Sequence, residues 1–126
     1  MQQIKSLKGA VVLVVEDDAE MLASVTNLIA NELGCRVLCA LSSAHALAII
    51  DSGVKVDILF SDVVMPGMDG VGLANVVREK FPALPVVLAT GWLRAIDLAT
   101  EAGAIPLIKP YSLAQVEAVL MEALRK

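Results

Sequence analysis

The feature that most constrains the fold is an alternation, repeated five times, of short β-branched apolar runs with longer segments of helical periodicity. The runs that we expect to form strands cover residues 11–15, 36–40, 58–60, 86–89 and 107–108. Glycines such as Gly34, Gly53 and Gly103 stand where the intervening helices should end. Strands that alternate with helices are typical of a parallel sheet covered by helices on both faces. The sequence therefore predicts an α/β fold with five strands and five helices.

The composition fits one soluble domain with an aliphatic core. The chain has 126 residues, of which 57% are hydrophobic but only 3% aromatic, so Val, Leu, Ile and Ala must fill the core. No apolar run approaches the roughly 18 residues of a membrane span, and residues 1–8 lack the pattern of a signal peptide. A net charge of −4 gives no basic surface for nucleic acid. We expect a cytoplasmic protein with a short leader at 1–8, one domain at 9–126, and no nucleic-acid or membrane partner.

Polar residues follow four of the predicted strands, at the point where each strand ends. Ligands of open α/β sheets bind outside the carboxyl ends of the strands, so these residues should face one crevice. They are Glu16, Asp17 and Asp18 after the first strand, Asp62 after the third, Thr90 after the fourth and Lys109 after the fifth.

These residue types suit phosphoryl transfer to a carboxylate. Crowded carboxylates repel one another unless they share a cation, and Mg²⁺ is a hard cation that takes oxygen ligands. A carboxylate can accept a phosphoryl group and become an aspartyl phosphate. The charge on the phosphoryl oxygens must then be neutralised by metal, lysine and hydrogen-bond donors, for which Lys109 and the Thr90 hydroxyl are suitable groups.

Four stretches resemble the signature motifs of response-regulator receiver domains in two-component signalling systems. They are VVEDD at 14–18, SDVVMPGMDG at 61–70, LATG at 88–91 and KPY at 109–111. The resemblance covers essentially the whole chain from Gly9 onward, and the motif at 61–70 is highly specific. It implies a flavodoxin-like three-layer sandwich with a five-stranded parallel sheet in the order 2-1-3-4-5. The last strand is then an edge, which agrees with Pro106 at its start.

The resemblance also implies roles for individual residues. Asp62 would be the phosphoacceptor, and Thr90 and Lys109 would bind the phosphoryl oxygens. The Lys109–Pro110 peptide bond is typically cis in this family. The implied Mg²⁺ ligands are Asp17 and Asp62 directly, the backbone carbonyl of Val64, and Glu16 through a water molecule.

The function implied is a phosphorelay step. A histidine kinase or histidine phosphotransfer domain would give its phosphoryl group to Asp62, and the modified surface would then change affinity for a partner such as a downstream effector. The chain would catalyse only its own phosphorylation and slow dephosphorylation, and would not be an enzyme acting on free metabolites. We expect no effector domain, and the sequence leaves open whether this is a separate regulator or the receiver of a hybrid kinase.

Two alternative functions follow from the same residues. A pseudo-receiver would bind partners without ever being phosphorylated, but the complete set of Asp17, Asp62, Thr90 and Lys109 argues against it. An Asp-nucleophile phosphatase of the haloacid-dehalogenase type needs an Asp-x-Asp motif after the first strand. Residues 15–18 read VEDD and do not supply that motif.

Several other polar residues have structural explanations that we prefer. Asp18 and Asp69 each precede a predicted helix, so we expect both to cap helices rather than bind metal. His45 lies on a predicted helix next to alanines and is expected to be a surface or packed residue, not a phosphotransfer histidine. Cys35 and Cys39 are four residues apart, which is not a redox or zinc spacing, so we expect two buried thiols.

The sequence departs from the family pattern in ways that predict its switching and lifetime. Many receivers carry an aromatic residue three positions before the lysine, but here that residue is Pro106. We therefore expect the response to phosphorylation in residues 90–96, where Gly91 gives backbone freedom. Val64 and Trp92 stand two residues after Asp62 and Thr90, respectively. Neither has a side chain that accepts a hydrogen bond from an attacking water, so we expect slow dephosphorylation, and Trp92 either packs or partly shields the site.

Overall fold

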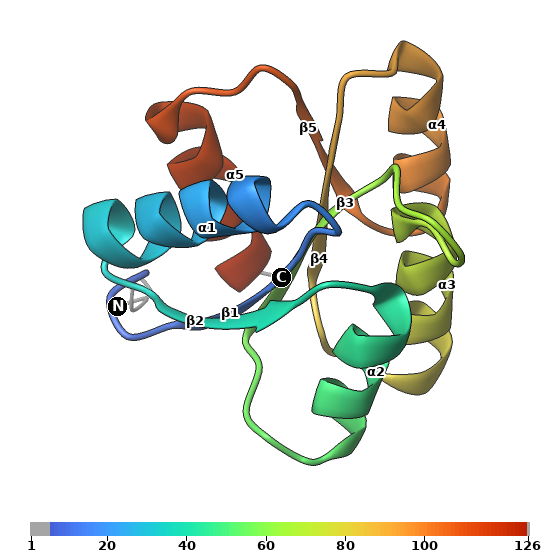
Figure 1. The fold of residues 1–126 in the computed structure, drawn as a ribbon, viewed down its shortest axis with the longest axis horizontal. Helices are drawn as coiled ribbons and strands as arrows, with labels where there is room; N and C mark the ends of the chain where they lie inside the picture. Colours follow the sequence, from blue (N-terminus) through green and yellow to red (C-terminus); the bar gives the residue numbers. More distant parts are fainter. Residues whose placement is uncertain (1–5, 126) are drawn as a thin grey trace.

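The computed structural model describes residues 6–125, and within them it contains one five-stranded parallel sheet in the order β2-β1-β3-β4-β5 (Figure 1). The elements are β1 (Val11–Val15), α1 (Ala19–Asn27), η1 (Leu28–Glu32), β2 (Arg36–Ala40), α2 (Ser43–Asp51), β3 (Ile58–Asp62), α3 (Gly70–Lys80), β4 (Val86–Thr90), α4 (Leu93–Glu101), β5 (Ile105–Ile108) and α5 (Leu113–Leu124). The predicted strand order and helix count are confirmed.

Helices cover both faces of the sheet and form a three-layer sandwich (Figure 1). Successive residues of a strand point to opposite faces, so Leu13 packs on one side and Val14 on the other. The first side is covered by α2, α3 and α4, and the second by α1, η1 and α5. A strand buried on both faces must be apolar at every position, which explains the continuous apolar run of β1.

Side chains cap the helices as the sequence predicts. Asp18 Oδ1 accepts hydrogen bonds from the amides of Glu20 and Met21 at the start of α1, and Asp69 Oδ1 accepts one from the amide of Gly72 at the start of α3. Each cap satisfies backbone donors that the first helical turn leaves without a partner. Both predictions of a capping role are therefore confirmed.

The structure corrects two local expectations. Cys35 is buried as predicted, but Cys39 is exposed, because β2 is an edge strand and only part of its surface is covered. Helix α1 was expected to run as one α-helix to Gly34. Instead it continues into the π-helical segment η1 from Leu28, and Gly34 follows with φ of 74°.

The chain termini are only partly described. The predicted leader at 1–8 lies largely outside the described residues, although Leu7 is buried against the α1 and α5 side of the sheet. The domain boundary at residue 9 therefore stays a prediction. Among residues 6–125, none of the helices has the length and apolar character that a membrane crossing requires.

Candidate functional site

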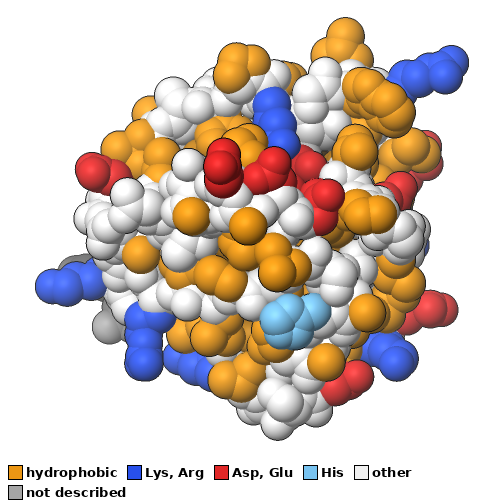
Figure 2. Space-filling view, in the orientation of Figure 1, with side chains coloured by type: hydrophobic (Ala, Val, Ile, Leu, Met, Phe, Trp, Pro, Cys, Tyr) orange, Lys and Arg blue, Asp and Glu red, His pale blue; other side chains and the backbone are white. Residues whose placement is uncertain are grey.

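The carboxyl ends of the strands bring three acidic side chains together. Carboxylate oxygens of Glu16, Asp17 and Asp62 all lie within 4.8 Å of one another. Figure 2 shows acidic side chains gathered beside a basic one on this face of the molecule. Glu16 and Asp17 follow β1 directly, and Asp62 ends the neighbouring strand β3. The parallel pairing of β1 with β3 thus places the acidic cluster where the sequence predicts it.

Asp62 forms an ion pair with Lys109, the residue that directly follows the edge strand β5. The Lys109 Nζ lies 2.6 Å from Asp62 Oδ1, and the two side chains are 28% and 13% exposed. The Lys109 amide donates to the Thr90 carbonyl, which continues the β4–β5 ladder up to the site. Such a charge-assisted contact holds the ammonium group within reach of any group attached to Asp62.

Glu16 is the most buried member of the acidic cluster, at 7% exposure. Burial raises the pKa of its carboxyl group above the ordinary range, and the nearby Asp17 and Asp62 act in the same direction. The Asp18 amide, which donates to Glu16 Oε2 at 3.1 Å, opposes this shift. A third carboxylate held this close to two others favours a shared cation. An all-oxygen donor set of this kind fits a hard ion such as Mg²⁺.

Thr90 lies at the end of β4, next to the strand that carries Asp62. The register pairs Asp62 with Ala89, the residue before Thr90. Thr90 is 2% exposed, and its Oγ1 accepts a hydrogen bond from the Trp92 amide at 3.0 Å. A hydroxyl that accepts from an amide still has its own proton to donate. The hydroxyl proton of Thr90 therefore remains available to an acceptor.

The loop after Asp62 is held by three hydrogen bonds. The Val63 amide donates to the Ala89 carbonyl, the Gly70 amide donates to the Val63 carbonyl, and Ser43 Oγ donates to the Met68 carbonyl at 2.7 Å. Val64, two residues after Asp62, projects from this loop and is 58% exposed. The loop thus has a fixed backbone and an exposed apolar side chain beside the site.

Gly70 is the tightest point of this loop. A Cβ added at Gly70 would overlap the carbonyl oxygen of Asp62 and would lie 2.9 Å from the Val63 Cα. Both atoms belong to the backbone and cannot rotate away. The glycine at the end of the 61–70 motif is therefore required by the close approach of the α3 start to the residue that carries the site.

We predict that Gly70→Ala lowers the free energy of unfolding by about 1–3 kcal/mol, the usual cost of overpacking. The matched control is Gly91→Ala, because a Cβ there meets nothing within 4 Å. We expect that change to leave the free energy of unfolding unaltered or to raise it by up to about 1 kcal/mol, because alanine lowers the conformational entropy of the unfolded chain. Urea denaturation of both variants measures the difference. Equal stabilities would show that the loop relaxes around the added methyl group.

The structure also places two aromatic residues near the site. Tyr111 packs edge-on against Phe60, with ring centroids 6.3 Å apart and planes at 90°. Trp92, by contrast, is 67% exposed, so of its two predicted roles packing is wrong. His45 is exposed on α2 (Figure 2). Of the two predicted placements, a surface residue or a packed one, it is therefore the surface residue.

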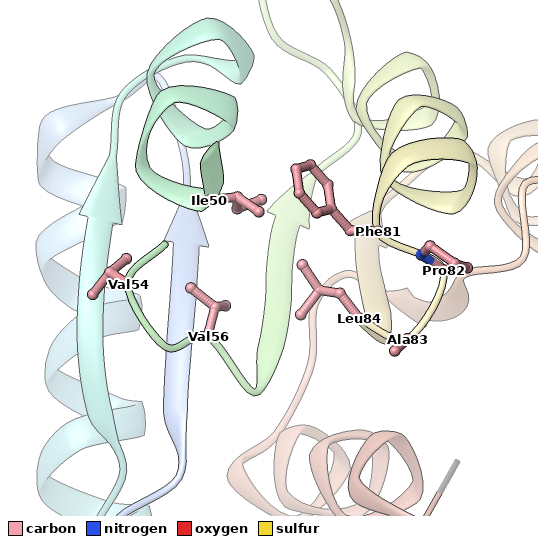
Figure 3. Close-up of a pocket in the computed structure, with 7 residues that line it drawn as sticks. All are labelled: Ile50, Val54, Val56, Phe81, Pro82, Ala83 and Leu84. Atoms are coloured by element: carbon pink, nitrogen blue, oxygen red, sulfur yellow. The ribbon is translucent and has the colours of Figure 1, made fainter. Parts of the chain in front are cut away.

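Two apolar grooves lie outside the acidic cluster. One, of about 450 Å³, runs between α1 and the segment after β5 and includes Lys109 and Tyr111 in its lining. The other, of about 370 Å³, lies near the amino ends of β3 and β4, where Ile50, Val56 and Phe81 face the space between the ends of α2 and α3 (Figure 3). Of these two grooves, the first shares the lining residue Lys109 with the site.

Comparison with known proteins agrees with this geometry. The family described as the response regulator receiver domain matches residues 12–120. The chain is 36% identical to the response regulator protein FleR of Pseudomonas aeruginosa over 82% of the chain and 22% of FleR. It is 38% identical to the sensor kinase CckA of Brucella abortus over 100% of the chain and 14% of CckA. The chain thus spans less than a quarter of either relative.

Solved structures show the same fold. A response regulator receiver domain protein from Clostridium thermocellum superposes with a TM-score of 0.85 at 27% identity, covering 92% of this chain and 94% of that one. The chemotaxis protein CheY4 of Vibrio cholerae superposes with a TM-score of 0.81 at 26% identity, covering 92% and 99%. The predicted flavodoxin-like sandwich is therefore confirmed.

Proposed function

Because the chain belongs to the response regulator receiver domain family of two-component signalling, we propose that Asp62 is the residue that accepts the phosphoryl group. The observation that carries this proposal is that Asp62 contacts the Lys109 ammonium group and also lies close to two further carboxylates, those of Glu16 and Asp17. Its Oδ1 is 2.6 Å from the Lys109 ammonium, and it shares the acidic cluster with Glu16 and Asp17. The Asp62 side chain is 13% exposed, so it is not completely closed off from a donor.

The reaction would proceed by attack of an Asp62 carboxylate oxygen on the phosphorus of a phosphohistidine. The new O–P bond forms while the N–P bond of the donor breaks, and the electron pair of that bond returns to the imidazole nitrogen. Lys109 would move its contact to a phosphoryl oxygen, and the Thr90 hydroxyl would donate to another. Both groups stabilise the charge on the transferring group.

The acidic cluster would hold the Mg²⁺ ion that this chemistry uses. Asp17 and Asp62 would bind it directly, the Val64 carbonyl would be a third protein ligand, and Glu16 would act through a water molecule. When bound, the ion neutralises negative charge that would otherwise oppose phosphoryl transfer. The all-carboxylate donor set within 4.8 Å supports this assignment.

We predict that Asp17→Asn weakens Mg²⁺ binding at least about tenfold, because loss of a direct ligand should cost no less than loss of a supporting one. Titration with Mg²⁺ monitored by the fluorescence of Trp92, the single tryptophan, measures the affinity. The matched control is Asp51→Asn at the end of α2, which should bind Mg²⁺ like the wild type. Unchanged affinity in Asp17→Asn would contradict the metal assignment.

The partners proposed are a histidine kinase or histidine phosphotransfer domain as donor and an effector protein as receiver of the signal, acting in the cytoplasm. The apolar groove that ends at Lys109 supports docking of the donor beside Asp62. We propose that the chain turns over no free metabolite and catalyses only its own phosphorylation and a slow hydrolysis.

Incubation with acetyl phosphate tests the proposed function. In the presence of Mg²⁺ the intact protein should gain the mass of one phosphoryl group, in a linkage stable to acid and labile to base. Chelation of Mg²⁺ should prevent the gain. A pseudo-receiver would gain no mass in either condition, and a phosphatase would release inorganic phosphate from added phosphomonoesters at many turnovers. Either result would overturn the proposal.

A further inference from the structure

Four polar or charged side chains are buried within residues 6–125, and all of them lie near the carboxyl ends of the strands. They are Glu16, Ser43, Ser61 and Thr90. Glu16 and Thr90 belong to the metal and phosphoryl sites of the proposed function. A buried hydroxyl costs free energy unless it forms a hydrogen bond, so the burial of the two serines needs an explanation.

Ser43 stands where the packing of α2 calls for an apolar residue. The buried residues of this helix are Ser43, Ala46 and Ile50. Their spacing of three and four residues is that of a helix face turned toward the core. The helix is already capped by Ser42, whose Oγ accepts a hydrogen bond from the His45 amide. Ser43 Oγ has another role, since it donates to the Met68 carbonyl at 2.7 Å.

Ser61 holds the other end of the same loop. It precedes Asp62 on β3, and its Oγ donates to the Asp62 carbonyl at 2.8 Å. Gly70 at the start of α3 lies against that same carbonyl oxygen. Ser61 is two residues after Leu59 and therefore points to the face of the sheet that α2 covers. Both serines thus approach the loop from one face of the sheet.

The two hydroxyls restrain the loop on either side of Val64. In the chain, Val64 lies between the Asp62 carbonyl, which accepts from Ser61, and the Met68 carbonyl, which accepts from Ser43. Hydrogen bonds from buried groups fix the direction of these two carbonyls. Such restraint limits the conformations of the segment between them, which carries the Val64 carbonyl.

We propose that Ser43 and Ser61 are positioning residues that hold this loop so that the Val64 carbonyl can bind Mg²⁺, an inference that rests on the proposed function. Neither hydroxyl would touch the ion, because each donates its proton to a carbonyl of the loop. Groups that orient metal ligands typically change metal affinity by about 10–100-fold. Because two serines share the task, each one alone should give the low end of this range.

Threonine and valine form a matched pair for the test, because they have nearly the same shape and only threonine has a hydroxyl. Titration with Mg²⁺, monitored by the fluorescence of Trp92, should show Ser43→Val binding about tenfold more weakly than Ser43→Thr. Ser43→Ala should lose the same affinity without added bulk. The same pair at Ser61 should give the same order. Equal affinities within a pair would overturn the role of that serine and leave the proposed function intact.

Ser52→Ala is the control for a serine bond on the same helix. Ser52 Oγ donates to the Ile49 carbonyl at 2.6 Å at the far end of α2. This variant should bind Mg²⁺ like the wild type. A tenfold loss of affinity in Ser52→Ala would show that any weakening of α2 lowers the affinity, and would overturn the positioning role.

Isotope labelling reports on the Val64 carbonyl directly. Val64–Met65 is the single Val-Met pair of the sequence, so valine labelled with ¹³C at the carbonyl and methionine labelled with ¹⁵N give one correlation. It should shift when Mg²⁺ binds the wild type, and in Ser43→Val it should shift with the weaker affinity. A silent resonance during a fluorescence change would overturn the positioning role without touching Asp62 as the acceptor. Absence of Mg²⁺ binding to the wild type would instead overturn the proposed metal site, and the positioning role with it.

Discussion

Asp62→Asn is expected to abolish incorporation of a phosphoryl group from acetyl phosphate. The substitution keeps the size of the side chain but replaces a charged oxygen nucleophile with a neutral amide. It also removes one of the three carboxylates of the cluster and the partner of Lys109. Intact-protein mass spectrometry over a time course with Mg²⁺ gives the stoichiometry. Labelling of this variant at the wild-type rate would show that another residue is the acceptor.

The matched control makes the same substitution seven residues later. Asp69 caps α3 through a hydrogen bond from the Gly72 amide, and asparagine caps helices about as well as aspartate. Asp69→Asn should therefore be folded and labelled like the wild type. Loss of labelling in both variants would point to a disturbed loop rather than to loss of the acceptor.

The second large effect concerns the lifetime of the phosphorylated state. Hydrolysis needs a water molecule in line with the P–O bond. Val64 and Trp92, two residues after Asp62 and Thr90 respectively, both have exposed side chains. Neither can accept a hydrogen bond from the water. We expect the double change Val64→Asn and Trp92→Glu to speed decay by up to about 10²-fold, the low end of general-base effects. Phosphoprotein remaining after removal of the donor gives the rate.

Val54→Asn is the control for an exposed valine made polar, since Val54 lines the groove near the amino ends of β3 and β4. Its decay rate should equal that of the wild type. If the double variant decays no faster than this control, or more slowly than the wild type, Val64 and Trp92 do not govern access of water.

The fold was predictable because the inner strands of its sheet are buried on both faces. Such strands need apolar residues at every position, so each strand is visible as a continuous run, and the predicted ranges differ from the structure only at their ends. The strands β3 and β4 extend to Asp62 and Thr90 themselves. Polar residues at strand ends then identified the acidic cluster, because parallel strands end at one edge of the sheet.

Features that depend on packing between distant segments were not predictable. Cys39 was expected to be buried because its neighbours are apolar, but exposure is set by how much of an edge strand the helices cover. The π-helical turn at Leu28–Glu32 could not be predicted, because the spacing of its apolar residues does not distinguish it from an α-helix. Tyr111 was quoted only as part of a motif. Its contact with Phe60 links residues from β3 and the segment after β5, which the sequence does not bring together.

The proline in β5 has a consequence for behaviour at high concentration. β5 is an outer strand of the sheet, and the Lys109 amide just after it points inward to the Thr90 carbonyl. Because inward and outward amides alternate along a strand of a parallel ladder, the position of Pro106 falls on the outward side, where proline offers no N–H. A β-strand of another molecule could not complete a ladder along this edge. Pro106 thus makes edge-to-edge pairing of two molecules along β5 less favourable.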